Sequence, residues 1–446
     1  MKSAPFGRGA LSEYLRGALW FLPSVLVAGS LVAGTVLSQV SVDERSLLGR
    51  LAFQGDAGAA RELLIVVSAT MITVTGLVFT LTLVALQIAS TQFSPRLLRN
   101  FLRDRKNQLV LGTFVSTFAY SLAGLHTVGQ PVAGEEEFVP RLAISGSLVL
   151  AFASVAMLVY FIHHIAHSIR IDTIMKEVER ETLAVMDESE PEPLDGVDSP
   201  QPLPDPPARA VVILAARSGY VDSMQPEMLV EIAAKYDVVI RIQPMVGDHV
   251  VEGTALGWVW PRYDAGDQPD PQRFRDSIDD AVVVGFERTT QQDVRFGLRQ
   301  LVDIALRAIS PAINDPYTAS QAVHHLSVLL NKLVARRLTN RVFNDSGGTL
   351  RVAVPHPDFD HYLELACGQI RRFGAKEPAV LRALVRLLAD VGAGATIAAR
   401  RESVASQVRL VLADAQREIP QRSDLATVEE LAALSSVERL TPTADV

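Results

Sequence analysis

The 446-residue chain lacks most of the features that mark a disulfide-stapled, metal-bound or nucleic-acid-binding protein. It has a single cysteine, Cys367, which excludes an intrachain disulfide framework and zinc sites built on several thiolates. It also lacks a basic excess, since the formal net charge is -8, and a general nucleic-acid binder needs a broad basic face. No G-x-S-x-G, H-E-x-x-H, Walker or G-x-G-x-x-G motif occurs. We therefore expect no enzymatic activity, no metal and no nucleic-acid partner.

Long apolar runs are what the sequence does contain. Four segments reach the length of about 20 residues that the hydrocarbon core of a bilayer requires. They cover residues 17–39, 63–89, 109–128 and 142–166. The first is too long for the apolar part of a typical signal peptide and three more follow it, so we interpret it as a retained anchor. The chain is thus predicted to be embedded in a lipid bilayer.

Positive charge is unevenly distributed around these spans. Cations are dense in three flanking segments: Lys2, Arg8 and Arg16; Arg96, Arg99, Arg103, Arg105 and Lys106; and Arg170, Lys176 and Arg180. The other two loops are poorer in cations and richer in acids. Because cation-rich loops stay in the cytoplasm, this pattern predicts a multi-pass membrane protein with both termini in the cytoplasm.

The second span carries a stripe of small and polar residues at helical spacing. Its members are Ala69, Thr73, Gly76, Thr80, Gln87, Ser90 and Ser94. Threonine and serine can return their hydroxyls to a carbonyl one turn earlier, so one interpretation is that the stripe only allows close helix packing. Gln87 has more donors and acceptors to satisfy and needs a partner or water. In the alternative interpretation, the stripes of several subunits line a hydrated pathway, because four helices of one chain form only a narrow bundle.

A basic amphipathic segment follows the second span. Arg96, Arg99, Arg103 and Lys106 share one helical face. They can anchor the segment to anionic headgroups at about 1 kcal/mol per cation, or encircle a cytoplasmic pore mouth and favour anions there.

The remainder of the chain predicts a soluble α+β region. A helical extension and an acidic, proline-rich linker cover residues 171–207. A small β-rich domain is expected over 208–270, with strands at 210–215 and 237–243, and a mostly helical domain over 271–446, ending in helices at 403–419 and 424–440. With residues 1–170 as the transmembrane domain, the predicted fold class is an integral membrane α-helical protein with four transmembrane helices and a C-terminal soluble α+β region, in which a small β-rich domain precedes a helical bundle.

One stretch of the helical domain has an unusually dense set of polar residues. The set comprises Arg288, Gln292, Asp293, Arg295, Arg299, Gln300, Asp303, Arg307, Asn314 and Asp315. Thr290 and Asp293 have the spacing of a capping box, and Asp315 followed by Pro316 predicts a helix start. The polar set predicts an internal network, an intersubunit contact or a ligand pocket, or else capping and surface ion pairs worth only about 0–1 kcal/mol each.

Two other patterns are similar to metal or cofactor sites, but each lacks a residue that such a site needs. His163 and His167 have the i, i+4 spacing of a metal-chelating pair, but no carboxylate on the same face completes a site, and His324 and His325 are expected to be exposed helix residues. The segment VGDHVVEG, followed by an apolar strand, resembles a hammerhead turn of a biotinyl-type barrel. No lysine occupies an exposed hairpin tip there, so we expect no covalent cofactor.

Three motifs carry a resemblance to a known family. SPRLLRNFLRDR, FIHHIAHSI and QDVRFGLRQLVDIALRAISPAINDPYTA are similar to segments of a widespread bacterial group of predicted membrane proteins with a domain of unknown function. The resemblance covers nearly the full length. It implies a membrane protein and directs attention to the two polar segments as functional surfaces.

Together with the resemblance, these features favour a homo-oligomeric channel or channel-like transporter of the bacterial inner membrane, with the second span lining the pathway and the soluble half assembling or gating it. The alternative hypothesis is a membrane-anchored sensor or scaffold whose cytoplasmic domain binds a ligand or a protein partner.

Overall fold

A computed structural model describes the chain over most of its length. The described residues are 20–40, 50, 52–92, 104–129, 139–190, 193–194, 201–263 and 269–434. Two compact units divide the chain, an N-terminal unit up to Thr173 and a C-terminal unit from Ile174 onward. The expected pathway residue Ser94 and the expected mouth residues Arg96, Arg99 and Arg103 lie outside the described residues, as does the side chain of Ser90.

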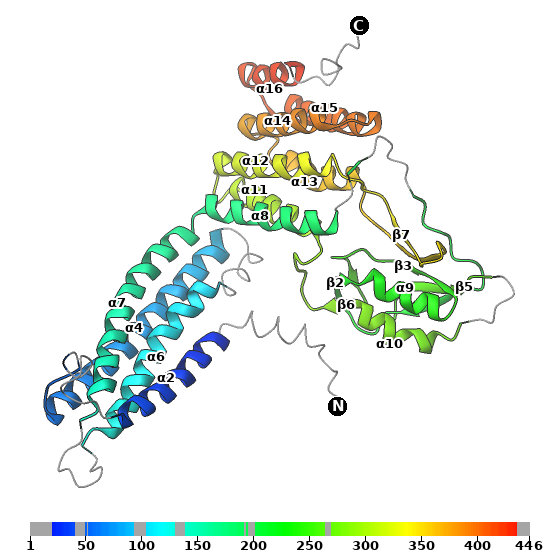
Figure 1. Cartoon of the computed structure of the whole chain (residues 1–446). Helices are drawn as coiled ribbons and strands as arrows, with labels where there is room; N and C mark the ends of the chain where they lie inside the picture. Colours follow the sequence, from blue (N-terminus) through cyan, green and yellow to red (C-terminus); the bar gives the residue numbers. More distant parts are fainter. Residues whose placement is uncertain are drawn as a thin grey trace, which may run out of the picture. The chain divides into compact units, whose positions relative to one another are not determined.

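Four long helices form the N-terminal unit (Figure 1). They are α2 (Phe21–Gln39), α4 (Ala57–Gln92), α6 (Arg105–Thr127) and α7 (Arg141–Ser168). Each is long and apolar enough to cross a membrane. The four predicted spans are thereby confirmed, and α4 begins six residues earlier than expected because Asp56 accepts a hydrogen bond from the amide of Ala59 and starts the helix.

Helix α6 is the central helix of this unit and packs against α2, α4 and α7. Its polar side chains are paired inside the bundle. The hydroxyl of Thr117 lies 3.0 Å from that of Ser154, and the hydroxyl of Ser121 lies 2.7 Å from that of Ser147, all four being buried. These contacts join α6 to α7 by hydrogen bonds and small residues, the usual means of helix association in a bilayer.

The C-terminal unit contains two β-sheets. Its strands are β1 (Val211–Leu214), β2 (Gly219–Met224), β3 (Val238–Ile242), β4 (His249–Val250), β5 (Ala255–Pro261), β6 (Val282–Gly285), β7 (Arg341–Asn344) and β8 (Leu350–Val354). The five-stranded sheet has the order β1-β5-β3-β8-β7 and the three-stranded sheet the order β4-β2-β6. Strand β3 pairs antiparallel with β5 and parallel with β8. Helices α9 (Pro226–Lys235) and α10 (Pro271–Ala281) pack beside the strands around a common apolar core that includes Ile240 and Val352.

The expected boundary at residue 270 does not separate a sheet domain from a helical domain. Strand β6 pairs with β2, and β8 pairs with β3, so residues beyond 270 complete both sheets. These pairings are non-local, and a short apolar run such as 282–285 has no periodicity that would identify it in the sequence.

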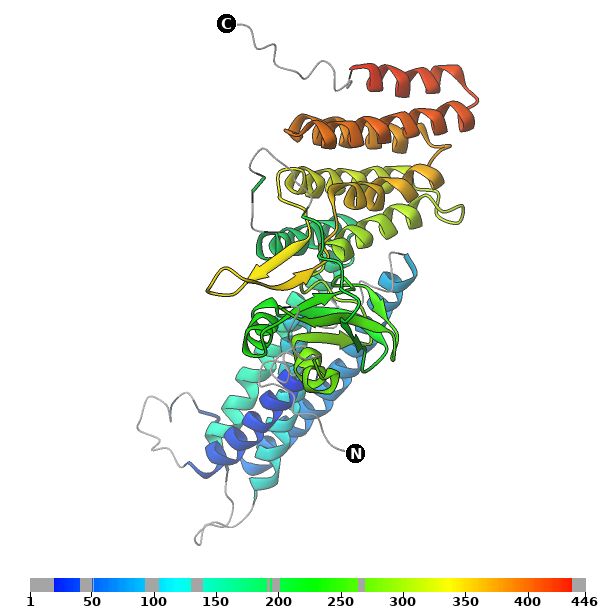
Figure 2. The same ribbon diagram turned by 90° about the vertical axis from the view of Figure 1, so that its right-hand side faces the viewer.

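Helices in successive layers make up the remainder of the C-terminal unit (Figures 1 and 2). They are α8 (Ile171–Ser189), α11 (Val294–Ala308), α12 (Pro316–Leu333), α13 (Phe359–Phe373), α14 (Pro378–Gly394), α15 (Ala398–Glu418) and α16 (Arg422–Leu434). Helix α12 packs between α11 and α14, and α14 packs against α15 and α16. A C-terminal region of sheets and helices after four apolar helices confirms the predicted fold class.

Candidate functional site

The polar stripe of α4 lies on the outer surface of the N-terminal unit. Thr73, Gly76, Thr80 and Gln87 are all exposed. A Cβ atom added to Gly76 would meet nothing within 4 Å. The opposite face of α4 packs into the bundle through Leu64, Val67, Met71, Val78 and Ala85. The stripe therefore does not serve packing among the four helices of one chain.

The hydroxyl groups of the stripe are satisfied within the helix. The hydroxyl of Thr73 donates to the carbonyl of Ala69 at 2.9 Å, and that of Thr80 donates to the carbonyl of Gly76 at 2.9 Å. This confirms the expected return of threonine hydroxyls to the backbone. Each oxygen keeps lone pairs that can accept a hydrogen bond from outside the helix.

Large side chains fill the interior of the same bundle. Phe114 of α6 and Phe161 of α7 are buried together with Val67 and Met71 of α4. Because protein interiors pack as densely as organic crystals, such a core leaves no continuous path for water or ions. A pathway along α4 would therefore have to run outside the four helices of one chain.

A hydrogen-bonded pair joins one end of α6 to α7. The ring nitrogen Nε2 of His164 lies 2.6 Å from a carboxylate oxygen of Asp104, which also caps α6 by accepting the amide of Lys106. Lys106 itself is exposed. His163 and His167 contact each other, with the Nδ1 of His167 2.9 Å from the carbonyl of His163. No group of three or more possible metal ligands occurs in the part of the chain that the structure describes.

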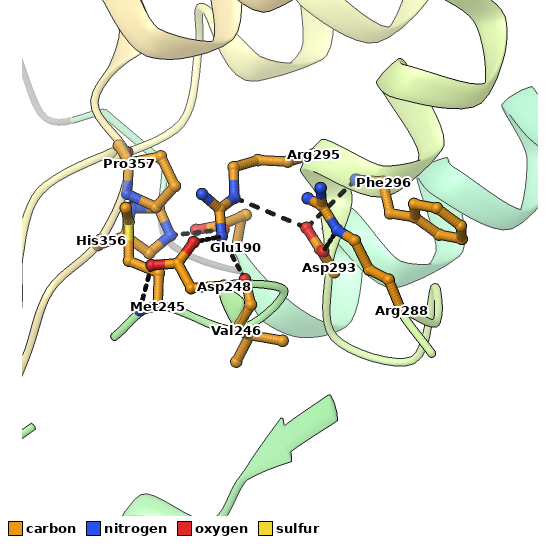
Figure 3. A network of polar contacts seen from close by, with 10 residues as sticks. All are labelled: Glu190, Met245, Val246, Asp248, Arg288, Asp293, Arg295, Phe296, His356 and Pro357. Atoms are coloured by element: carbon orange, nitrogen blue, oxygen red, sulfur yellow. Dashed lines mark hydrogen bonds and ion pairs between the residues drawn. The ribbon is translucent and has the colours of Figure 1, made fainter. Parts of the chain in front are cut away.

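The predicted polar set of the C-terminal unit gathers in part around Asp293 (Figure 3). The carboxylate of Asp293 accepts a hydrogen bond from Nε of Arg288 at 2.5 Å and lies 3.7 Å from Nε of Arg295. It also caps α11 by accepting the amide of Phe296 at 3.2 Å. Only 2% of the Asp293 side chain is exposed, so this carboxylate is buried between two cations. The helix begins at Val294 with Asp293 as its cap, so the expected capping box at Thr290 is wrong by three residues.

The turn before β4 supplies the next contacts of this network. Arg295 donates to Asp248 at 2.9 Å and to the carbonyl of Val246, and Asp248 accepts the amide of Met245 at 2.9 Å. Gly247 has a φ of +87°, and a Cβ atom there would lie 1.9 Å from a carboxylate oxygen of Asp293. A glycine is required at this position both by its backbone conformation and by the approach of the carboxylate.

A third group of charges lies at the end of α8. Glu190, only 4% exposed, accepts from Arg341 at 2.5 Å and lies 2.6 Å from Nε2 of His356. The other ring nitrogen of His356 lies 2.8 Å from the carbonyl of Pro357. Arg336 donates to the backbone carbonyl of Glu190 at 2.9 Å. Arg341 also donates to the carbonyl of Ser189, so two arginines satisfy carbonyls at the C-terminus of α8, where cations are favoured by the helix dipole.

Burial and charge affect two aromatic groups next to these ions. Burial raises the pKa of Tyr362 well above its ordinary value, and the negative charge of Glu190 adds to the shift. Burial lowers the pKa of His361, and the charge of Arg295 lowers it further. Both groups are therefore held in their neutral forms at pH 7. The Asp293 contacts thus join the turn before β4 to α11, and the Glu190 contacts join the end of α8 to β7 and to the segment before α13.

The other predicted polar residues lie apart from Asp293. Gln292 exchanges two hydrogen bonds with the backbone of Met224, at 2.9 and 3.2 Å. Arg299 pairs with Asp303 at 2.8 Å and donates to Gln369 of α13 at 2.7 Å. The structure thus resolves the set into separate contacts rather than one pocket.

Asp315 and Asn314 lie at the start of α12, and the side-chain oxygen of a third member, Gln300, lacks a hydrogen bond among the described residues. Asp315 caps α12 by accepting the amide of Thr318 at 3.0 Å, as predicted, and the preceding Asn314 is exposed with a φ of +51°. Gln300 is 2% exposed, and its Oε1 has no hydrogen-bond partner among the described residues.

Several participants were not predicted from the sequence. They are Glu179, Glu190, Asp248, His325, Arg341 and His356. Their partners are up to 166 residues away along the chain, so no local spacing could identify them. The glycine of VGDHV is the one local signal for a close contact at the turn. His325, expected to be exposed, is instead paired through Nδ1 with Glu179 at 2.5 Å.

Glu179 joins α8 to α12, and its ionisation makes the stability of the C-terminal unit depend on pH. Burial alone would raise its pKa, but hydrogen bonds from Lys176 and His325 lower it below the ordinary 4.5. A lowered pKa contributes stability that is present above pH 4.5 and is lost as the pH falls through the folded-state value. We expect Glu179→Gln to lower the free energy of unfolding by about 2 kcal/mol at pH 7 and by much less below pH 4, because hydrogen bonds to charged groups contribute about 1.5–3 kcal/mol. Urea titrations at both pH values measure this, and an equal loss at both would contradict it.

Cys367 lies in α13 and is fully buried. Burial raises the pKa of its thiol from the ordinary 9.0 to about 12. Since only the thiolate is nucleophilic, we expect at least a thousandfold slower reaction with maleimide at pH 7.5 in the folded protein than in urea. Mass spectrometry of time points with and without urea measures this rate. Rapid labelling of the folded protein would show that the thiol is accessible.

Comparisons with known proteins agree with an integral membrane protein. Residues 16–390 match the family described as "Predicted membrane protein (DUF2254)", and the chain belongs to this family. It is 49% identical over 424 residues to proteins named "Uncharacterized protein Rv1290c" of Mycobacterium tuberculosis and "Uncharacterized protein Mb1321c" of Mycobacterium bovis, an alignment that covers 94% of this chain and 80% of each relative. No solved structure matches. The predicted family resemblance is confirmed.

Proposed function

We propose that the protein is a homo-oligomeric channel or channel-like transporter of the bacterial inner membrane. The observation that carries this proposal is that Thr73, Gly76, Thr80 and Gln87 of α4 face away from α2, α6 and α7. In a monomer this row of hydroxyl groups and small side chains would face lipid, which offers the threonine oxygens no hydrogen bonds. Copies arranged around an axis would instead bring the stripes together, and a row of hydroxyl oxygens would then face a shared hydrated space.

The charge pattern supports an orientation for this assembly. The cation-rich flanks support an orientation with both termini in the cytoplasm, by the positive-inside rule. The C-terminal unit is then cytoplasmic, and the basic segment that includes Lys106 would lie at the inner mouth. Cations at a pore mouth raise the local concentration of anions.

The C-terminal unit offers a means of gating. Helix α7 ends at Ser168 and α8 begins at Ile171, so a short connection follows the fourth span. Helix α8 is held in its unit by the Glu179–His325 pair at one point and by Arg336 and Arg341 at its end. A change within this unit would therefore move the residues that follow α7.

Single introduced cysteines provide a direct test, since the native Cys367 is buried. In the full-length protein in liposomes, we expect Thr73→Cys and Thr80→Cys to react with a charged, membrane-impermeant thiosulfonate and to form disulfide-linked dimers under mild oxidation. The controls Val149→Cys and Val155→Cys lie on an exposed apolar face of α7 and should remain unmodified.

Ion flux completes the test. Liposomes with the native protein should release trapped ions, and Thr80→Leu or Gln87→Leu should change the rate at least fivefold, whereas Val155→Leu should not. The channel is rejected if three results coincide. The liposomes release no ions, the protein is a monomer in detergent, and the cysteines of the stripe are as unreactive as those of α7.

A sensor is the second candidate, and one observation favours it. The buried Gln300 Oε1 has no partner among the described residues, although buried polar groups are nearly always hydrogen-bonded. A small donor-bearing ligand could satisfy it. In this case Gln300→Leu would abolish a saturable metabolite-induced stabilisation of the full-length protein without changing ion flux.

A further inference from the structure

A groove runs along helices α12 and α14 of the C-terminal unit. It consists of two adjoining hollows of about 670 and 540 Å³ that share His324 and Arg386. The two helices run in the same direction, since Ser320 and Ala379 line one hollow, while Asn331 lies near Gly394 further along. Volumes of this size are typical of small-molecule sites.

Cations without partners line this groove. Lys332, Arg382 and Arg386 are exposed, and none of them forms an ion pair or hydrogen bond with the described residues. His324 lies between them. Two acids also reach the groove: Asp390, which accepts a hydrogen bond from Ser327 at 3.3 Å, and the exposed Glu430. The three permanent positive charges therefore exceed the negative ones, in a chain whose net charge is -8.

Apolar side chains complete the lining. Val328 is 43% exposed in one hollow and Leu434 is 71% exposed in the other, which is also lined by Ala379 and Ala383 of α14. Exposed aliphatic groups beside free guanidinium groups fit a ligand with both an anionic and an apolar part. Guanidinium groups match the geometry of phosphate oxygens through paired hydrogen bonds.

We propose that this groove binds a phosphate-bearing molecule with a short apolar part. Its phosphate contacts Arg386, which both hollows share, and Arg382 of the same hollow, while its apolar part covers Leu434. Lys332 adds positive charge in the adjoining hollow, beside Val328. The same chemistry occurs in soluble phosphate esters and in the headgroup region of anionic lipids. The site is independent of ion conduction and stands whether or not the protein is a channel.

Hexyl phosphate is the probe that tests this site. The full-length protein is reconstituted in nanodiscs of zwitterionic lipid, and binding is measured by titration calorimetry at low salt. We expect saturable binding, at least fivefold tighter than that of inorganic phosphate because of the apolar part. Arg382→Gln/Arg386→Gln should weaken it at least tenfold. The double variant Arg372→Gln/Lys376→Gln removes two exposed cations outside the groove and should change it less than twofold.

Nanodiscs that contain phosphatidate separate the two sources of phosphate. If phosphatidate weakens binding of hexyl phosphate to the native protein, a lipid headgroup occupies the groove, and if binding is unchanged, the natural ligand is a soluble ester. Both results support the site. The proposal is overturned if hexyl phosphate does not bind saturably, or if the groove variant and the control variant, both with native unfolding midpoints, bind it equally.

Discussion

Replacing Asp293 by asparagine is expected to lower the free energy of unfolding of the C-terminal unit by about 3 kcal/mol. Asparagine can still cap α11, so the change removes the negative charge and keeps the helix start. Arg288 at 2.5 Å and Arg295 at 3.7 Å would then lack their shared counter-ion in a buried position. Removing one partner of a buried ion pair typically costs about 3–5 kcal/mol.

The control for this prediction is the same substitution at the cap of α12. Asp315 also starts a helix, and hydrogen bonds from the Thr318 side chain and amide lower the pKa of its carboxyl, but no cation is among its partners. Asp315→Asn should cost less than about 1 kcal/mol. Urea unfolding followed by fluorescence of Trp258 and Trp260 in β5 reports on this unit, with Trp20 replaced by phenylalanine. Equal losses for the two variants would show that Asp293 acts only as a cap.

Gly297→Ala is expected to destabilise the packing of α8 on α11 by about 3 kcal/mol. A Cβ atom at position 297 would lie 1.9 Å from the hydroxyl oxygen of Thr182 and 2.8 Å from its Cβ, so one helix must move away from the other. Overpacking of this kind typically costs about 1–3 kcal/mol, and here the hydroxyl of Thr182 is itself held by the carbonyl of Val178 at 2.6 Å.

A compensating substitution makes the second prediction specific. Thr182→Gly alone should cost about 1 kcal/mol, mainly because it removes a buried side chain and leaves a small cavity, and to a lesser extent because glycine has a lower helix propensity than threonine. In Thr182→Gly/Gly297→Ala the new methyl group has room, so we expect the double variant to recover at least half of the loss caused by Gly297→Ala. If the loss of unfolding free energy in the double variant equals the sum of the two single losses, the clash with Thr182 is not the cause of the instability of Gly297→Ala.

The membrane half of the fold could be predicted from the sequence because lipid imposes a simple rule on every residue of a span. The apolar runs at 63–89 and 142–166 lie within α4 and α7, and the Asp315-Pro316 pair starts α12 as predicted. These signals are local, so they can be found without knowledge of the tertiary structure. The exposed face of α4 could be recognised as distinct, but the sequence could not show that it points away from the other three helices.

The site in the C-terminal unit could be predicted only in part. Arg288, Asp293 and Arg295 are close in the chain, and the density of polar residues there favoured an internal network only as one of several alternatives. Glu190 and His356 belong to the same region of the structure but lie 166 residues apart in the sequence. Their contact follows from the β7–β8 hairpin: Arg341 of β7 pairs with Val354 of β8 and also binds Glu190, and His356 lies two residues beyond Val354. Local sequence patterns could not predict contacts between residues so far apart in the chain.

The length of α4 has a consequence for the bilayer around the protein. Its apolar portion between Leu63 and Gln87 rises about 37 Å, at about 1.5 Å per residue, whereas a typical hydrocarbon core is about 30 Å thick. Such a hydrophobic mismatch is relieved by helix tilt or by local thickening of the lipid. The tilt of α4 should accordingly follow acyl-chain length, so that membrane thickness becomes a variable to which this helix, and the stripe it carries, responds.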